Sequence, residues 1–346
     1  MNSKKMKILQ VIDDLSVGGA ERVLVDLSNL LNYHNEDVHI LCISNYGALK
    51  DLLHKNIEVT LLERKSKIDP HAIRKVIRLL NQYDIIHVHM RHTYRYVAII
   101  AKLSGNFSKL VFHDHYGKID IDKNIPFGLD SFLKPRKYIG VSKSLTNWAT
   151  KHLRIPKQSI FLLPNTIFPD NTFKNIKGTD FVQVGNIKRV KNQLFSLSLI
   201  KRLEKTITFY GKVVEPEYFD ELQDYVQRHN LNDNVIFIHD EVNIQRILPN
   251  YSFGLQTAHS ESGPLVLIEY MSKGIPFLSN YTGEVATLLN KVDQRFIIDN
   301  FDLDQWQKRI EKIQAENTSA TLKQIFDQYF SAEKYYAKCI RIYNEK

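Results

Sequence analysis

Two glutamates separated by seven residues, Glu261 and Glu269, are the side chains of this sequence whose type and spacing most strongly suggest chemistry. Glu261 lies in a loop that contains Ser, Gly and Pro, and Glu269 lies early in an expected helix that follows Gly263 and Pro264. The first turn of a helix has unpaired backbone N–H groups, which suit a phosphate or another oxyanion. Because carboxylates bind hydroxyl groups, the segment predicts a site for a ligand with both hydroxyls and an anionic group.

A nucleotide sugar fits this combination better than a bare nucleotide or a bare sugar, because it joins a ribose, a diphosphate and a pyranose. Both acids could instead be solvated on a helix face. The apolar neighbours of Glu269, in 265–268 and at Met271, argue against this alternative, since a buried carboxylate normally has a partner. Backbone amides near Gly263 and Leu265 would meet sugar and phosphate, whereas Pro264 has no N–H to donate.

Short β-rich runs alternate with helical patterns along the whole chain, which is typical of parallel sheets with crossover helices. In the first half the expected strands cover residues 7–12, 38–43, 59–62, 84–89, 109–112 and 137–141, with helices at 20–31 and from Pro70 onward. In the second half they cover 181–184, 207–210, 235–238, 252–256 and 275–279, with a helix near 218–229. A polar stretch, 162–178, predicts a linker. The sequence therefore predicts an α/β fold with two Rossmann-like domains and a ligand at the carboxyl ends of the strands.

The composition describes a globular protein with two domains. The chain has 346 residues, of which 43% are hydrophobic and 25% charged, and it contains no run of about 18 apolar residues that would indicate a membrane span. The apolar run behind the N-terminus, 8–12, indicates a strand and not a signal peptide. We expect Cys42 and Cys339 to be reduced core thiols, and the protein to be cytoplasmic.

The net charge of +9 is confined to the first half of the chain. Residues 1–170 contain 25 basic and 16 acidic residues, whereas the remainder contains 22 of each. Such asymmetry indicates an anionic partner or a solvated surface without one. Arg74, Lys75 and Arg78, which lie beside apolar residues of the same expected helix, could contact anionic lipid. No recognisable nucleic-acid reading module is present, so nucleic acid is not expected as a partner.

Four histidines, His87, His89, His113 and His115, lie at the ends of two expected strands. Neutral imidazoles are good metal ligands. However, neither a cysteine nor a convincing carboxylate accompanies them, and alternate residues of a strand need not converge on one point. We therefore expect no metal site.

Several motifs occur together in this order along nearly the full length of the chain. They are Gly18-Gly19-Ala20-Glu21 after the first strand, the strand from Asp84 to His89, Val111-Phe112-His113-Asp114-His115, Val141-Ser142, Pro164-Asn165 and the pair Glu261 and Glu269. With this set the chain resembles the retaining glycosyltransferases of family 4 (glycosyl transferases group 1), which have the GT-B fold. A Gly-Gly loop alone would be a weak signal.

The resemblance implies two Rossmann-like domains that face each other across a cleft. Residues 1–168 would form the acceptor-side domain, 169–325 the nucleotide-sugar domain, and 326–346 a terminal helix that crosses back to the first domain. Catalytic roles would fall to Glu261, His113 and Lys191. The donor would be bound by Gly18, Gly19, Gly185, Asn186, Arg189, Gly263, Pro264, Leu265 and Glu269. His89 and His115 would contact the acceptor or support the site, and His115 also competes with His113 for the donor sugar.

The chain departs from the family pattern at Asn186. The family places an arginine directly after the glycine that corresponds to Gly185, and a lysine five residues later, to neutralise the departing diphosphate. Lys191 matches this lysine, but Asn186 carries no charge. Either Lys188 or Arg189 takes over, or the diphosphate is held more weakly. Thr282-Gly283-Glu284 resembles a family turn near the nucleotide.

The resulting hypothesis is a retaining, metal-independent transfer of a sugar from a nucleoside-diphosphate donor to an acceptor hydroxyl. The donor is a co-substrate, with UDP favoured over GDP, and no other cofactor is expected. The acceptor would be a glycan, a lipid-linked glycan or an anionic polymer, with peripheral contact at the inner face of the membrane. Two alternatives are a nucleotide-sugar 2-epimerase and a non-catalytic GT-B partner subunit, the latter supported by Asn186.

Overall fold

The computed structural model describes residues 5–64, 66, 68–119, 121–169 and 180–345. The chain divides into two compact units: unit 1 comprises Met1–Phe168 and Ala332–Lys346, and unit 2 comprises Pro169–Ser331. The expected linker extends into 170–178, which lies outside the described residues. Helix α11 (Ser319–Tyr329) continues past residue 326, where we expected the terminal segment to begin, and α12 (Ala332–Asn344) belongs to unit 1.

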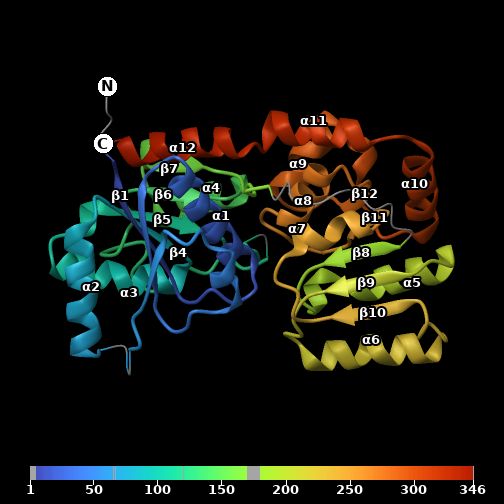
Figure 1. Ribbon diagram of the computed structural model, residues 1–346, viewed down its shortest axis with the longest axis horizontal. Coiled ribbons are helices and arrows are strands. Elements are labelled where there is room, and N and C mark those ends of the chain that lie inside the picture. The colour runs from blue at the N-terminus through green and yellow to red at the C-terminus, as the bar shows by residue number, and fades with distance from the viewer. Residues whose placement is uncertain (1–4, 65, 67, 120, 170–179, 346) are drawn as a thin grey trace. The chain divides into compact units, whose positions relative to one another are not determined.

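Unit 1 contains a parallel sheet with, among the described residues, seven strands in the order β3-β2-β1-β4-β5-β6-β7 (Figure 1). Their bounds are β1 Lys7–Ile12, β2 Asp37–Cys42, β3 Glu58–Leu61, β4 Ile85–His89, β5 Leu110–Asp114, β6 Tyr138–Gly140 and β7 Ile160–Leu162. The helices are α1 Gly19–Tyr33, α2 Pro70–Gln82, α3 Arg91–Leu103, α4 Lys143–Trp148 and α12. Helix α1 packs against α12, and α2 packs against α3. The strand order reverses between β1 and β4, where Rossmann-like folds bind ligands.

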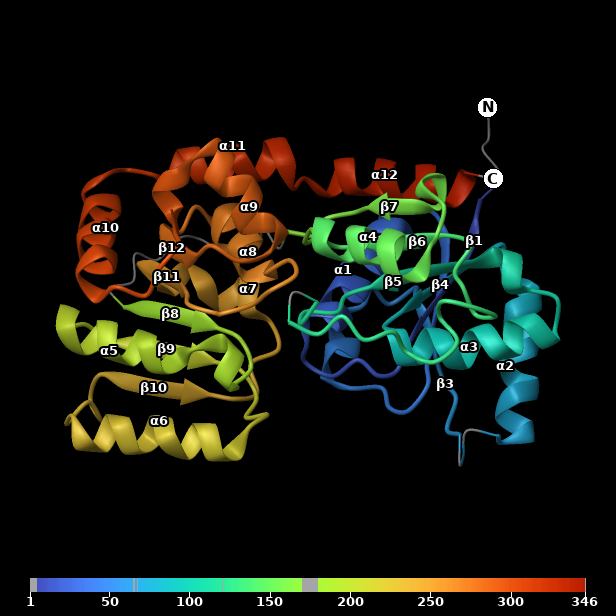
Figure 2. The same cartoon turned by 180° about the vertical axis from the view of Figure 1, so that it is seen from behind.

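Unit 2 repeats this architecture with, in its described part, six parallel strands in the order β10-β9-β8-β11-β12-β13 (Figure 2). Their bounds are β8 Phe181–Val184, β9 Ile207–Tyr210, β10 Val235–Ile238, β11 Phe253–Gln256, β12 Phe277–Asn280 and β13 Ile297–Ile298. The helices are α5 Gln193–Leu203, α6 Pro216–Arg228, α7 Ile244–Ile247, α8 Leu265–Lys273, α9 Gly283–Val292, α10 Leu303–Ala315 and α11. Here the order reverses between β8 and β11.

The predicted α/β class with two Rossmann-like units is confirmed. Central strands such as β1 are fully buried after their first residue, as a parallel sheet covered on both faces requires. Helix α2 begins as its sequence predicts, with Pro70 in its first turn and the Asp69 carboxylate accepting hydrogen bonds from the next two amides. Strands β7 and β13 were not predicted, because β7 ends where the polar linker was expected to begin and β13 has only two residues.

In the part of the chain that the structure describes, no helix has the length and apolar character needed to cross a bilayer. Cys42 and Cys339 are both buried free thiols.

Candidate active site

Unit 2 brings Lys191 and Glu261 together next to the point where its strand order reverses. Lys191 ends a 3-10 turn after β8, and Glu261 lies in the loop after β11. The Nζ atom of Lys191 forms an ion pair with Oε1 of Glu261, and Nε2 of Gln256 lies 3.3 Å from the same oxygen. The two side chains are 19% and 14% exposed, so the pair is shielded but still accessible to solvent. Two residues predicted to contact one ligand therefore contact each other.

Two buried polar residues, which the sequence did not single out, hold the Lys191 loop against the sheet. Gln183 on β8 donates from Nε2 to the carbonyl oxygen of Lys191 at 3.2 Å and to Oγ1 of Thr257 at 3.0 Å. The Thr257 hydroxyl donates in turn to the same carbonyl oxygen at 3.2 Å. The signal available in the sequence was a polar side chain within or directly after an apolar strand.

The turn from Thr282 to Glu284 supports the Glu261 loop. The amide of Glu261 donates to Oγ1 of Thr282 at 2.9 Å, and the amide of Glu284 donates to the carbonyl oxygen of Ser262 at 2.9 Å. Gly283 has a φ of +83°, and a Cβ there would lie 2.8 Å from Cδ of Pro264. A glycine is needed at this position both for its backbone conformation and for its close approach to the loop.

The N-terminus of α8 follows this loop directly. Pro264 precedes the first helical residue, Leu265, and no side chain caps the helix, so its first-turn amides are open to an anion. Gly263 lies just before this helix start. Glu269 is in the second turn and only 5% exposed, as its apolar neighbours predicted.

The loop after β8 contains the other predicted donor residues. A Cβ on Gly185 would lie 3.5 Å from Cδ of Lys191, so the lysine side chain passes next to this glycine. The Asn186 carbonyl oxygen accepts a hydrogen bond from the Gln193 side chain at 3.1 Å. The guanidinium of Arg189 forms a 2.8 Å ion pair with Glu221 on α6. The charge of Arg189 is thus already paired with an acid other than Glu261.

Unit 1 contributes the predicted histidines and the Gly-Gly loop. Gly18 and Gly19 form the start of α1 after β1, and the residue at the N-cap, Gly18, has no side chain to cap this helix. Ligand-capable nitrogens of His87, His89 and His113 lie within 4.8 Å of one another. The three side chains therefore converge, which the sequence alone did not predict.

The convergence follows from the register of two neighbouring strands, in which His89 of β4 is paired with His113 of β5. The imidazoles already bond to one another: Nε2 of His87 lies 3.1 Å from Nδ1 of His113, and Nδ1 of His89 lies 3.0 Å from Nε2 of His115. Three imidazoles could ligate a zinc ion, but the bond between His87 and His113 would then have to break.

Burial keeps these histidines neutral. Desolvation lowers the pKa of His87 to about 3 and holds the pKa values of His89 and His113 well below the usual range. Both nitrogens of His89 have partners, His115 and Gln10. By contrast, Nε2 of His113 is buried and has no hydrogen-bond partner among the described residues. Of His113 and His115, the former has the nitrogen better suited to a ligand.

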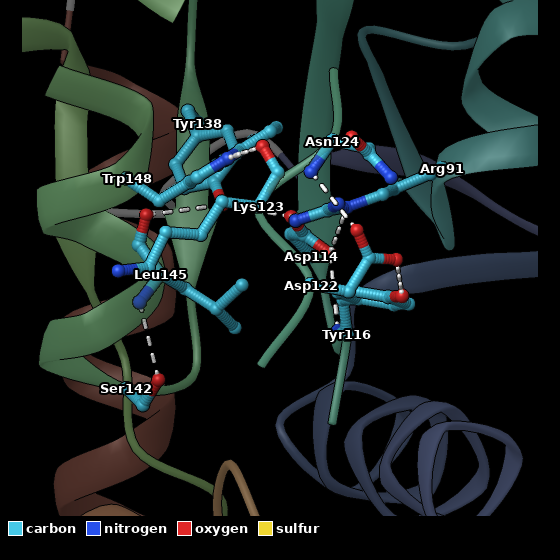
Figure 3. Close-up of polar contacts among 10 residues, drawn as sticks. All are labelled: Arg91, Asp114, Tyr116, Asp122, Lys123, Asn124, Tyr138, Ser142, Leu145 and Trp148. Carbon is cyan, nitrogen blue, oxygen red and sulfur yellow. Dashed lines mark hydrogen bonds and ion pairs between the residues drawn. The ribbon is translucent and has the colours of Figure 1, made fainter. Parts of the chain in front are cut away.

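An ion pair fixes the strand end that carries His113 (Figure 3). Nε of Arg91, the first residue of α3, donates to Oδ2 of Asp114 at 2.9 Å, and the Arg91 guanidinium lies over the rings of Tyr116 and Trp148 at 4.2 and 4.0 Å. The Tyr138 hydroxyl also donates to Asp114 at 2.8 Å. Asp114 directly follows His113, so this network restrains the histidine backbone. Sequence reasoning missed Arg91, whose signal was a basic residue two positions after a strand end.

Two family models match consecutive parts of the chain. The model described as Glycosyltransferase Family 4 matches residues 17–171, and the model described as Glycosyl transferases group 1 matches residues 166–329. The chain belongs to glycosyltransferase family 4. Both matches include the predicted motifs of their half of this glycosyltransferase.

Named relatives match most of the length of this glycosyltransferase. The capsular polysaccharide biosynthesis glycosyltransferase CapH of Staphylococcus aureus is 24% identical over 330 residues, which cover 89% of this chain and 90% of that protein. The N-acetyl-alpha-D-glucosaminyl L-malate synthase of Bacillus anthracis is 23% identical over 82% of this chain and 81% of that protein. The crystal structure of Anabaena HepE with UDP and glucose superposes with a TM-score of 0.78 at 18% identity, over 97% of this chain and 98% of that one. This structural likeness shows the GT-B fold.

The Arg91–Asp114 pair generates a stability prediction. Replacing Asp114, whose side chain is 1% exposed, by Asn leaves the buried Arg91 charge without its anion. We expect this to lower the free energy of unfolding by about 3 kcal/mol. Denaturant unfolding of the purified variant measures the change. The control is Asp130→Asn, an exposed acid in the same unit, for which we expect about 0.5 kcal/mol or less. Equal losses in both variants would contradict the assigned role.

The low pKa of His87 generates a pH prediction. Its pKa is about 3 in the folded protein against a usual 6.5, so the unfolded chain binds more protons between these values. Stability is therefore lost as the pH falls below about 6.5, by about 2 kcal/mol at pH 5 for this group alone. Thermal unfolding of wild type and His87→Gln between pH 7 and 5 tests this. The variant should lose less stability over that range, and identical slopes would refute the assignment.

Proposed function

We propose that this glycosyltransferase transfers a sugar from a nucleoside-diphosphate donor to an acceptor hydroxyl with retained anomeric configuration. The observation that carries the proposal is the Lys191–Glu261 ion pair, whose acid lies in the loop that leads into the uncapped N-terminus of α8. A cation, an acid and open backbone amides in one region match the phosphates and hydroxyls of a nucleotide sugar.

In this proposal the ligand separates the ion pair, and Lys191 and Glu261 each bind a different part of it. Breaking the anomeric C–O bond places negative charge on the diphosphate, and Lys191 with the amides of Leu265 and the next residues would stabilise it. Glu261, released from the lysine, would bind hydroxyls of the donor sugar. Glu269 would bind the ribose, and Nε2 of His113 would bind a further sugar hydroxyl.

A crystallised structural neighbour supports the choice of the donor's nucleotide. HepE has been crystallised with UDP and with UDP-glucose, which favours a uridine nucleotide over a guanosine nucleotide here as well. We infer that transfer needs no metal ion, because Lys191 and the helix amides supply positive charge at the leaving group. Turnover in the presence of EDTA should therefore be unchanged. Loss of turnover with EDTA would instead point to His87, His89 and His113 as the metal-binding residues.

The product is proposed to be a cell-surface polysaccharide or glycan. CapH is a capsular polysaccharide biosynthesis enzyme, and this chain matches it over nine tenths of its length. The excess positive charge of the first 170 residues favours an anionic or lipid-linked acceptor bound by unit 1.

The contact with lipid was expected at α2, but its apolar residues are occupied in the fold. Val76 is fully buried, and the partly buried Ile73 and Ile77 pack against the core, so of the expected lipid contacts only the basic side chains are exposed. Large apolar side chains are exposed in the segment between β5 and β6 instead. Phe127 and Phe132 are 75% and 49% exposed, with ring centroids 5.9 Å apart. We propose that these two rings contact the membrane or the lipid of the acceptor.

The donor site gives an activity prediction. We expect Lys191→Met and Glu261→Gln each to lower kcat/KM about a hundred- to a thousandfold, because each removes an interaction that stabilises the transition state. Transfer to an acceptor panel, after a thermal-shift screen for the donor nucleotide, measures the effect. The control is Arg202→Gln, an exposed cation paired with Asp304 in the same unit, which should leave kcat/KM unchanged.

Three outcomes of this experiment separate the alternatives. Near-normal transfer by Glu261→Gln would refute the role given to this acid. Conversion of a UDP-sugar without any acceptor would indicate an epimerase. Nucleotide binding without turnover on any acceptor would indicate a partner subunit.

The exposed rings give a binding prediction. Phe127→Ser combined with Phe132→Ser should reduce cosedimentation with anionic vesicles severalfold, because two apolar anchors are lost. Leu103→Ser serves as the matched control, since Leu103 is 79% exposed on α3 of the same unit. Equal binding by both variants, or equal binding of wild type to neutral and anionic vesicles, would count against a lipid contact at these rings.

A further inference from the structure

A chain of hydrogen bonds connects the C-terminal helix to His113. The hydroxyl of Tyr343 on α12 lies 2.7 Å from Nδ1 of His87, and Nε2 of His87 lies 3.1 Å from Nδ1 of His113. Tyr343 is 4% exposed, and both histidines are fully buried. The chain ends at Nε2 of His113, which has no partner in the described part of the protein.

The direction of these bonds must be the same along the whole chain. A neutral imidazole has one N–H donor and one lone-pair acceptor. If His87 accepts a bond at Nδ1, it must donate at Nε2, and His113 must then accept at Nδ1 and carry its proton on Nε2. If the bonds run in the opposite direction, Nε2 of His113 has no proton. The direction at Tyr343 therefore decides whether the open nitrogen of His113 is a donor or an acceptor.

The phenol favours one direction. Burial raises the pKa of Tyr343, so its hydroxyl keeps its proton. Two other side chains lie against this hydroxyl, Cys339 one helical turn earlier and Gln10. The bond to Gln10 lowers the pKa of Tyr343, as a donor to the phenol oxygen does, and a thiol is only a weak hydrogen-bond acceptor. An imidazole nitrogen is a better acceptor than the thiol. The O–H of Tyr343 therefore points to Nδ1 of His87.

We propose that Tyr343 is a positioning residue, which holds His113 through His87 in the tautomer that carries its proton on Nε2. In that form His113 donates a hydrogen bond to a hydroxyl oxygen of the donor sugar. The tautomer follows from the hydrogen-bond chain alone, whereas the contact with the sugar rests on the proposed function. No bond between heavy atoms is made or broken in this role.

The neighbouring histidine pair supplies an internal comparison. His89 stacks on His87 with ring centroids 4.5 Å apart, but its nitrogens bond to Gln10 and His115. Gln10 also contacts the Tyr343 hydroxyl, but its Oε1 can only accept, so His89 keeps its proton on Nε2 when that hydroxyl is lost. Loss of the Tyr343 hydroxyl should change the protonated nitrogen of His87 and His113 and leave that of His89 as it is.

The test compares Tyr343→Phe with Tyr335→Phe. Both tyrosines are 4% exposed on α12, but the Tyr335 hydroxyl has no hydrogen-bond partner among the described residues, so its loss controls for a buried oxygen on the same helix. Nitrogen-15 NMR of the imidazoles at neutral pH should show His113 protonated at Nε2 in wild type and in Tyr335→Phe. In Tyr343→Phe, we expect a substantial fraction protonated at Nδ1.

The kinetic measurement separates positioning from folding. Tyr343→Phe should lower kcat about tenfold, as expected for one neutral hydrogen bond. The affinity for UDP should be unchanged, because UDP lacks the transferred sugar whose hydroxyl His113 would bind. The proposal would be overturned if His113 of the wild type carried its proton on Nδ1. It would also be overturned if Tyr343→Phe had the same His113 tautomer and the same kcat as the wild type. If no sugar transfer is found at all, the proposed function fails, but the NMR measurement still decides the tautomer.

Discussion

In a parallel sheet covered by helices on both faces, the polar side chains that can meet a ligand gather at the carboxyl edge of the strands. There they must satisfy one another until a ligand arrives, because buried polar groups without partners are costly. Both units of this protein obey this constraint. In unit 2 the result is the pair of Lys191 and Glu261, and in unit 1 it is the pair of Arg91 and Asp114 together with the histidine chain.

The two ion pairs differ in how easily a ligand can replace them. Lys191 and Glu261 are 19% and 14% exposed, and an ion pair that reaches solvent contributes on the order of 1 kcal/mol to stability. A diphosphate, which has several charged oxygens, can therefore replace Glu261 as the partner of Lys191. Asp114 is 1% exposed, and breaking its pair with Arg91 would cost several kcal/mol. The first pair is therefore suited to exchange and the second to permanent support of His113.

The sequence predicted the strands and motifs that a local pattern shows. It did not predict the side-chain contacts between residues that are far apart in the chain. Apolar runs located the central strands, but not β7, which ends where the polar linker was expected to begin, or β13, which has only two residues. Glu261 and Lys191 were found through motifs, although their mutual contact across 70 residues was not. The convergence of the histidines was not predicted, because the register of β4 against β5 is a property of the sheet. Tyr343 could not be linked to His87, which is 256 residues away, by any local signal.

After unit 2 the chain returns to unit 1, so the structure of unit 1 depends on the last residues of the chain. Helix α12 is held in unit 1 by more than apolar packing: Nζ of Lys137 donates to the carbonyl oxygens of Ile342 and Tyr343 at 3.1 and 2.9 Å, at the end of the helix where a cation is favourable. The Tyr336 hydroxyl donates to Glu36 at 3.0 Å. Residues 1–168 alone lack these partners. The histidine chain can therefore be completed only after the whole of unit 2 has been synthesised, which ties the geometry of His113 to the integrity of the C-terminus.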